Sequence, residues 1–320
     1  MKKMVLAACA TVLLAALPAA AQEWPTKPVK LIVPFAAGST PDVTGRMLTD
    51  YLQNKFGHTF IVENRPGASG NTGTDAVAKA DPDGHTVGMS ILGPLGINAI
   101  LFGQLPYDPT KDLAFVTMLV TQPNALAVNT GLGVNTVPEL IALLKANPGK
   151  YNYGSIGNGS LSHMSMEAIV LKAGSKMVHI PYAGSPAAMT ALMRGDVQVA
   201  SLPAIAVTPH VASGQVKILA ISTDERSALL PGIRTLTENG IDVQADAWSG
   251  LIAPAKTPDA IVEKIRAAFT EAVTSPGIKE KLAVQLTEPI PNTPAQFRAR
   301  VEADVARWKP VIEAAGIKVN

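Results

Sequence analysis

An alternation of apolar strands, glycine-containing turns and helices constrains this chain more than any other feature of its sequence. Residues 29–35 are apolar except for Lys30, which is typical of a strand whose two faces are both covered. They run into a turn that contains Gly38, and the apolar residues that follow it recur at helical spacing. The same succession recurs along much of the chain. It therefore predicts an α/β architecture with parallel strands.

The expected elements follow from the positions of these apolar runs and of the turns between them. Strands are expected at 29–35, 60–63, 86–91, 125–129, 151–155, 177–181, 197–202 and 216–222. Helices are expected to include residues 43–52 and to lie at 74–80, 137–147, 161–173, 186–194 and 207–213. From Leu251 onward the pattern predicts mostly helix, at 258–274, 276–283 and 294–315.

The length of the chain, 320 residues, suggests about two domains. We expect one lobe at residues 22–123 and 223–320, and a second lobe at residues 124–222. The chain would then cross between the lobes twice, near 116–126 and 222–250. Two crossings form a hinge about which rigid lobes can close on a ligand. In open α/β sheets such a ligand binds beyond the carboxyl ends of the strands.

Residues 1–21 have the features of a secretory signal peptide. Lys2 and Lys3 precede an apolar run that is too short to span a bilayer, and three alanines before Gln22 form a cleavage site. Cys9 ends a stretch that looks like a lipoprotein box, but cleavage there would leave too few apolar residues ahead of it. We therefore expect an exported, unlipidated protein that starts at Gln22, with residues 1–21 removed.

The composition of the mature chain excludes several classes of protein. The single cysteine, Cys9, lies in the expected signal peptide, so no disulfide is expected and stability must come from core burial. Removal of Lys2 and Lys3 leaves 25 basic against 25 acidic residues, and no Lys/Arg cluster occurs. We therefore expect no binding to nucleic acid or to an anionic membrane surface. No second long apolar run follows residue 21, so a soluble mature protein is expected.

Three turns that lead from a strand into a helix share one design. Each combines glycine with a hydroxyl residue that suits a helix start: Thr40 before Pro41, Ser160 after Gly157-Asn158-Gly159, and Ser185-Pro186 after Tyr182-Ala183-Gly184. Free main-chain N–H groups at the positive end of a helix dipole favour an anion. Ordinary capped helices have the same features, so anion binding and simple capping both fit each turn taken alone.

A series of motifs in the same order along the chain resembles the tripartite tricarboxylate transporter substrate-binding proteins (TctC-like, the Bordetella uptake gene or "Bug" family). The motifs cover essentially the whole mature chain. They are KPVKLIVPFAAG at 27–38 with Asp42 and Arg46, VENRPGASGN at 62–71, AKADPDG at 78–84, LPYD at 105–108, GNGS at 157–160 with His163, IPYAG at 180–184 and WSGLIAP at 248–254.

The resemblance implies a type II periplasmic-binding-protein fold, in which two α/β lobes are joined by a hinge of two crossings with the ligand cleft between them. It implies a periplasmic binding protein, not an enzyme, with no cofactor and no metal. Its ligands would be small carboxylates, such as di- or tricarboxylates, held largely by main-chain amides, hydroxyls and bridging waters. Its partners would be one large and one small integral-membrane subunit of a transporter. We expect the protein itself to be a monomer.

Carried over to this sequence, the resemblance places the ligand-binding residues in three loops and at four facing positions. The set is Phe35, Ala37, Gly38, Ser39, Thr40 and Asp42 in the first loop, Gly157, Asn158, Gly159, Ser160 and His163 in the second, Tyr182, Ala183 and Gly184 in the third, and Ser90, Pro203, Ala204 and Trp248 facing them. The first loop departs from the family, which usually has a second glycine and no proline there. The ligand preference of that loop is therefore open.

Several of these residues also have structural interpretations. His163 fits either a donor to a ligand carboxylate or a residue that packs and caps locally. Asp42 fits a residue that stabilises the helix dipole better than one that touches an anion. Trp248 fits the core as well as a cleft wall. Arg46 and Arg65 are interpreted as structural ion-pair residues.

The sequence offers little support for an enzyme. A serine hydrolase built on Ser160 and His163 is the main alternative, but two residues at one helix start cannot form a triad, and no G-x-S-x-G elbow occurs. The five histidines lack metal-ligand spacing, and no phosphate-binding or dinucleotide-binding motif occurs. For the ligand, the 5% aromatic content favours an aliphatic acid. An aromatic carboxylate remains the alternative ligand, because Phe35, Tyr182 and Trp248 are able to line a pocket for an aromatic ring.

Overall fold

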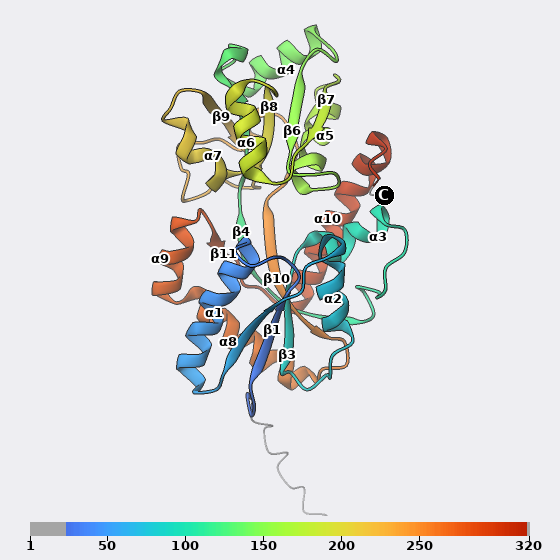
Figure 1. Cartoon of the computed structure of the whole chain (residues 1–320), viewed down its shortest axis with the longest axis vertical. Helices are drawn as coiled ribbons and strands as arrows, with labels where there is room; N and C mark the ends of the chain where they lie inside the picture. Colours follow the sequence, from blue (N-terminus) through green and yellow to red (C-terminus); the bar gives the residue numbers. More distant parts are fainter. Residues whose placement is uncertain (1–23, 319–320) are drawn as a thin grey trace, which may run out of the picture.

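The first of two sheets has the strand order β11-β4-β10-β3-β1-β2 and forms the lower lobe in Figure 1. The computed structural model describes residues 24–318, so the expected signal peptide lies outside the described residues. The strands are β1 (Val29–Val33), β2 (Phe60–Asn64), β3 (Thr86–Ser90), β4 (Leu113–Gln122), β10 (Ala247–Pro254) and β11 (Glu288–Pro289).

Helices cover both faces of this sheet, so the apolar side chains of its strands are buried on either side. They are α1 (Thr40–Phe56), α2 (Asn71–Ala78), α3 (Asn98–Leu101), α8 (Asp259–Thr274), α9 (Pro276–Val284) and α10 (Pro294–Ala315). On one face, Leu31 of β1 packs in a cluster with Leu48 of α1 and Phe269 of α8. On the other face, Ile32 packs in a cluster with Val77 of α2 and Phe297 of α10.

The second sheet has the order β7-β6-β8-β5-β9 and forms the upper lobe. Its strands are β5 (Asn124–Asn129), β6 (Asn152–Ser155), β7 (Val178–Pro181), β8 (Val199–Pro203) and β9 (Val216–Ile221). Its helices are α4 (Val137–Ala146), α5 (Leu161–Lys172), α6 (Ser185–Arg194) and α7 (Ala204–Val211). Most of these bounds lie within two residues of those expected from the sequence.

The prediction of parallel sheets was wrong for part of each lobe. In the first lobe, β10 runs antiparallel to both of its neighbours, β3 and β4. In the second, β5 runs antiparallel to β8 and β9. Neither β4 nor β10 was expected as a strand. The reason is topological: β4 leads the chain out of the first lobe and β10 brings it back, so two neighbouring strands have to run in opposite directions.

A buried polar cluster joins the two passages between the lobes. The chain enters the second lobe at Pro123, between β4 and β5, and returns between Ala245 and β10. Asn124 Nδ2 donates to the carbonyl of Ala245 at 2.9 Å, and Ser222 Oγ donates to the carbonyls of Asn124 and Ala245 at 3.1 Å each. These bonds hold the two connecting segments side by side.

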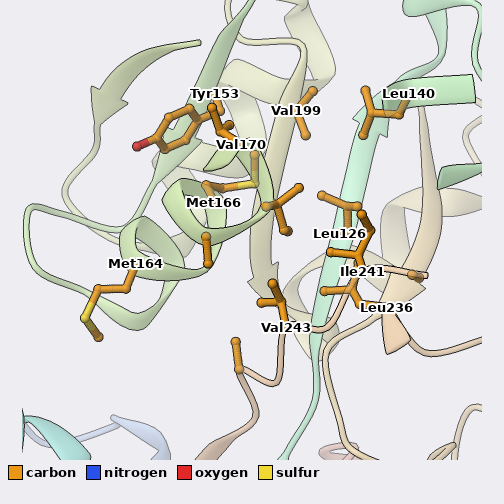
Figure 2. Close-up of a cluster of buried hydrophobic side chains, with 14 of the residues drawn as sticks. Leu126, Leu140, Tyr153, Met164, Met166, Val170, Val199, Leu236, Ile241 and Val243 are labelled. Carbon is orange, nitrogen blue, oxygen red and sulfur yellow. The ribbon is translucent and has the colours of Figure 1, made fainter. Parts of the chain in front are cut away.

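The last helix also connects the lobes. Helix α10 rises from the lower lobe to the base of the upper one (Figure 1), where Trp308 and Ile312 pack in one cluster with Met164 of α5. Figure 2 shows that Leu236 and Ile241, which follow β9, lie beside Leu126 of β5. The expected division into one lobe of residues 22–123 and 223–320 and a second lobe of residues 124–222 stays a prediction about which segments move as rigid units.

Candidate functional site

A cavity of about 500 Å³ lies where loops of the two lobes meet. It opens beyond the carboxyl ends of β1, β3 and β6, the edge at which open α/β sheets bind ligands. Its walls are Phe35, Ser69, Ile91, Leu92, Gly93, Ile97, Asn98 and Leu101 of the first lobe, residues 156–161 and Met164 of the second, and Asp246, Ala247 and Trp248 at the hinge. Other surface cavities of similar size occur, but their linings lack this set of strand ends.

The loop before α5 supplies the main polar surface of the cavity. As predicted, Ser160 is the N-cap of α5: its Oγ accepts from the N–H of His163 at 3.2 Å and donates to the carbonyl of Gly157 at 2.7 Å. Gly157 and Gly159 have φ values of 127° and 70°, which other residues rarely adopt.

Some main-chain donors of this loop and of the start of α5 have no acceptor within residues 24–318. They include the N–H groups of Asn158 and Leu161, and both residues line the cavity. Both lie at the start of α5, where the helix dipole is positive. This end of the cavity therefore favours an anionic group.

Ser69 lies on the first-lobe side of the cavity in a strained turn. Ala68 and Ser69 have φ values of 46° and 54°, a left-handed conformation that is uncommon outside glycine. Asn98 fixes this turn, because its Nδ2 donates to the carbonyl of Ser69 at 3.2 Å and to Oδ1 of Asn71 at 2.7 Å. Strain of this kind costs about 1–3 kcal/mol and is found often at ligand sites.

The wall of the cavity at the hinge consists of Asp246, Ala247 and Trp248, and its only charged group is the carboxylate of Asp246. Asp246 accepts from Thr121 Oγ1 and from Arg300 Nη2, both at 2.7 Å, so its charge is paired. Trp248 is buried and donates its indole N–H to Asp304 at 2.8 Å. Trp248 therefore belongs to the core and to the cavity wall at once, which joins the two interpretations left open by the sequence.

In the first loop, the structure corrects one prediction. Ser39, not Thr40, is the N-cap of α1, and the Ser39 hydroxyl is buried without a partner among the described residues. The buried carboxylate of Asp42 orders the loop instead, because Oδ2 accepts from the N–H of Gly38 at 2.8 Å. Pro41 has no N–H to donate, and the Asp42 side chain bonds the N–H of Gly38, four residues earlier in the loop.

Asp42 is held by Arg46 and Asn64 as well as by Gly38. Burial alone would raise the pKa of Asp42, but its bonds to Arg46, to the Gly38 amide and to Asn64 outweigh burial and lower the pKa below its usual value. Of the first loop, Phe35 lines the cavity. Ala37, Gly38, Ser39, Thr40 and Asp42 lie outside its lining.

The third loop and most facing positions also lie outside the cavity lining. Tyr182, Ala183 and Gly184 precede α6, whose N-cap is Gly184 with φ at 101°. Ser90 is buried and shares a hydrogen bond with Thr74 at 3.2 Å. Pro203 is the N-cap of α7, and the N–H of Ala204 donates to the carbonyl of Pro123 at 2.9 Å.

His163 is packed beneath the second loop. Its side chain is 9% exposed, and its Nδ1 accepts from the N–H of Gly159 at 3.1 Å. Its ring stacks on that of His179, with 3.8 Å between the centroids. Burial and the neighbouring His179 lower the pKa of His163 to about 4. In this structure His163 therefore packs and caps locally, the second of its two interpretations.

Several lining residues were not among the predicted site residues. Ser69 lies in the VENRPGASGN motif, where no ligand role was assigned to it. Leu161 and Met164 are part of an expected helix, and residues 91–98 carry no polar motif. Among residues 24–318, no group of three or more His, Cys, Asp or Glu side chains has the geometry of a metal site.

Known proteins resemble this chain along nearly its whole length. Residues 44–317 match the family described as the tripartite tricarboxylate transporter family receptor, TctC. Protein BugT of Bordetella pertussis is 34% identical over 95% of this chain and 94% of its own length. No helix among residues 24–318 is long and apolar enough to cross a membrane.

Solved structures of the same kind match the fold. Rpa4515 of R. palustris with adipate is 31% identical, with a TM-score of 0.80 over 92% of this chain and 99% of that one. MatC of Rhodopseudomonas palustris with bound malate is 29% identical, with a TM-score of 0.74 over 90% and 100%. The predicted two-lobe periplasmic-binding-protein fold is thereby confirmed. The chain belongs to the TctC family, the tripartite tricarboxylate transporter receptors, whose members are solute-binding proteins and not enzymes.

Proposed function

We propose that this protein captures a small carboxylate in the cavity between its lobes and delivers it to the membrane subunits of a tripartite tricarboxylate transporter. The observation that carries this proposal is the start of α5, where the unpaired N–H groups of Asn158 and Leu161 line the cavity. The relatives Rpa4515 and MatC, solved with adipate and malate, support a carboxylate as the ligand.

The electrostatics of the cavity suit an anion held by main-chain groups. No Lys, Arg or His lines the cavity among the described residues, and Arg300 already balances the charge of Asp246. One helix N-terminus contributes about 0.3–2 kcal/mol toward an anion. Micromolar affinity needs about 8 kcal/mol. The remainder would come from hydroxyl and amide hydrogen bonds and from burial of the ligand against Phe35 and Trp248.

We infer that the first and third loops contact the ligand only after the two lobes have closed on it. Gly38 and Gly184 follow β1 and β7, at the carboxyl ends of strands in the two lobes. Rotation about the hinge at Asn124 and Ser222 would bring such edges together on the ligand. Hydroxyls of Ala37–Asp42 and Tyr182–Gly184, and those amides that are not bonded within their own loop as the Gly38 and Gly184 amides are, would then add to the contacts of the second loop.

Export and a membrane partner complete the proposal. The sequence of residues 1–21 supports secretion into the periplasm, with cleavage before Gln22. There the protein would act as a monomer that presents its loaded form to the large and small membrane subunits. Intact mass of periplasmic material tests the export step, and a mature species that does not begin at Gln22 contradicts it.

The experiment that tests the ligand class is a thermal-shift screen followed by calorimetric titration. Adipate, malate, citrate, benzoate and glutamate are the probes, with the matching amides or alcohols as uncharged controls. A ligand present at 100 times its Kd stabilises the folded state by about 2.7 kcal/mol, so at least one acid should raise the Tm by several degrees. If no carboxylate shifts the Tm, or if an acid is turned over into product, the proposal fails.

A further inference from the structure

Two histidines, the buried His163 and the half-buried His179, are stacked beneath the ligand loop. His163 is on α5 and His179 is on β7, and their ring planes are 15° apart with centroids at 3.8 Å. Tyr153 of β6 also stacks on His179, with 4.9 Å between the centroids. The pair lies in the second lobe and its side chains do not line the cavity.

Each ring is connected to one glycine of the loop. The N–H of Gly159 donates to Nδ1 of His163 at 3.1 Å. The N–H of Gly157 donates to Ser155 Oγ at 3.2 Å, and Ser155 Oγ lies 2.7 Å from Nε2 of His179. The loop residues between and after these glycines, Asn158 and Leu161, carry the unpaired N–H groups of the cavity.

The bond from Gly159 requires a neutral His163. An imidazole nitrogen that accepts a hydrogen bond carries no proton, whereas both nitrogens of an imidazolium are donors. Protonation of His163 would therefore remove the only side-chain acceptor of the Gly159 amide among the described residues. Protonation of His179 would place a positive charge against the ring of His163 and oppose a second charge there.

The surroundings of the pair keep both rings neutral near pH 7. Burial lowers the pKa of His163, with a further contribution from His179, to about 4, and burial lowers the pKa of His179. Glu167 of α5 also faces the pair: its Oε1 lies 3.9 Å from His163 Nε2, and it accepts a hydrogen bond from Tyr153. Among residues 24–318, no Lys or Arg contacts either ring.

We propose that His163, stacked on His179, is a positioning residue for the ligand: as a neutral ring it holds Gly157–Ser160 in the conformation that presents the loop amides, and acid releases that loop. This inference rests on the proposed function, because it concerns how the carboxylate is held. It gives His163 a role in binding without contact to the ligand.

The test compares two substitutions that separate hydrogen bonding from ring packing. His163→Asn keeps an acceptor near the position of Nδ1 but does not titrate, whereas His163→Phe keeps a ring and has no acceptor. Adipate and malate titrations at pH 7.5 should give near wild-type affinity for His163→Asn. For His163→Phe the affinity should fall about 2- to 12-fold, which corresponds to one net hydrogen bond. His58→Asn, in the turn between α1 and β2 of the other lobe, is the control and should not change the affinity.

The pH dependence supplies a second readout. At pH 4 about half of the wild-type molecules carry the proton on His163. If the protonated form binds about 2- to 12-fold more weakly, the affinity should fall about 1.3- to 1.9-fold relative to His163→Asn. Titration of the ligand's own carboxyl groups affects both proteins and cancels in this ratio. Because the unfolded chain binds the proton near pH 6.5, folding stability also falls between about pH 6.5 and 4. Circular dichroism at each pH therefore checks that the protein is folded.

The outcomes distinguish this inference from the proposed function. If neither acid binds the wild-type protein at any pH, the proposed function fails for these acids. If they bind and His163→Phe matches His163→Asn at every pH, the positioning role is wrong. NMR of the free protein tests the hydrogen bond between Gly159 and His163 without ligand: the chemical shift of the Gly159 amide should titrate with the same apparent pKa as the His163 ring. An amide that does not follow this titration would overturn the inference even if no ligand were found.

Discussion

The indole Nε1 of Trp248 lies 2.8 Å from Oδ2 of Asp304, so a wall of the cavity is hydrogen-bonded to helix α10. The same carboxylate accepts from Arg300 at 2.9 Å and from Arg307 at 2.7 Å. Arg300 also binds Asp246 beside the cavity. Strand β10 and helix α10 are thus held by one charged network, in which Asp304 is buried and the two arginines are partly exposed.

Replacement of Asp304 should destabilise the whole fold. Asp304→Ala would leave Arg300 and Arg307 without their shared carboxylate and Trp248 without an acceptor. Leaving a fully buried charge without its partner costs about 3–5 kcal/mol. Arg300 and Arg307 are 30% and 34% exposed and Arg300 keeps Asp246, so we expect a loss of about 2–3 kcal/mol in the free energy of unfolding in urea. Glu302→Ala, on the exposed face of the same helix, should change it by less than about 0.5 kcal/mol. A loss below 1 kcal/mol for Asp304→Ala would contradict the network.

Removal of the α5 N-cap should reduce both stability and ligand affinity. Ser160→Ala loses the acceptor for the His163 N–H and the donor to Gly157, at a cost of about 0.5–2 kcal/mol in unfolding free energy. Thr136→Ala removes a comparable cap from α4, where Thr136 Oγ1 accepts from the Glu139 N–H at 3.3 Å. Both variants should lose similar stability. Calorimetric titration should show weaker carboxylate binding for Ser160→Ala alone, and equal affinities would move the ligand away from this loop.

A single methyl group at Gly250 should disturb the packing of α10 on the first sheet. A Cβ at this position of β10 would overlap the ring of Phe297, which is fully buried and makes edge contacts with Phe115 and Trp248. Because the ring has no free space to move into, Gly250→Ala should cost about 1–3 kcal/mol and lower the Tm.

The matched control for this change is Gly277→Ala. A Cβ there would have no heavy atom within 4 Å, apart from its neighbours in the chain and the backbone of its own helix, and Gly277 lies in helix α9. Alanine is the better helix former, so the Tm should stay constant or rise slightly. A Gly250→Ala protein as stable as Gly277→Ala would show that α10 packs differently.

Asp42 should contribute stability that is lost in acid. Its folded-state pKa is lowered from 3.8, so the unfolded chain takes up the proton first as the pH falls. The contribution is therefore fully present above about pH 4 to 5, and it is lost as the pH falls through the lower, folded-state value. The gap in unfolding free energy between wild type and Asp42→Asn should shrink from pH 6 to pH 2.5. Asp50→Asn, on the exposed face of α1, should show no such narrowing. A constant gap would mean that folding does not lower the pKa of Asp42, so its bonds to Arg46, Gly38 and Asn64 would not favour the ionised form.

The helices and most strands were predictable because their patterns are local. Helix α10 was expected at its observed bounds, 294–315, from its helical pattern. The structure adds a local reason for its start: Thr293 and Gln296 form a capping box ahead of Pro294. The strands β4 and β10 were missed although residues 113–122 and 247–254 are apolar runs like that of β1. What no local pattern records is their place and direction: the chain leaves and re-enters the lobe there, so they lie side by side and antiparallel at the centre of the first sheet.

The second loop was predicted more accurately than the first. Ser160 follows two glycines and precedes a residue with a free N–H, so its capping role depends on its neighbours alone. Thr40 also follows a glycine and suits an N-cap, but Ser39 takes that position. The Asp42 carboxylate accepts from the N–H of Gly38 and is held by Arg46 and Asn64, which fixes the conformation of the loop. Asn64 is 22 residues away from Asp42, beyond the reach of any local pattern.

The sequence by itself determined most of the order of strands, glycine turns and helices, the family and the position of the α5 helix start, because each depends on residues close together in the chain. The tertiary structure alone decided which loops meet at the cavity, that His163 stacks on His179 beneath the ligand loop instead of facing it, and that Asp304 holds Trp248. These contacts join residues 16 and 56 positions apart. Their geometry depends on how two sheets and a bridging helix pack, and no spacing within one segment specifies that.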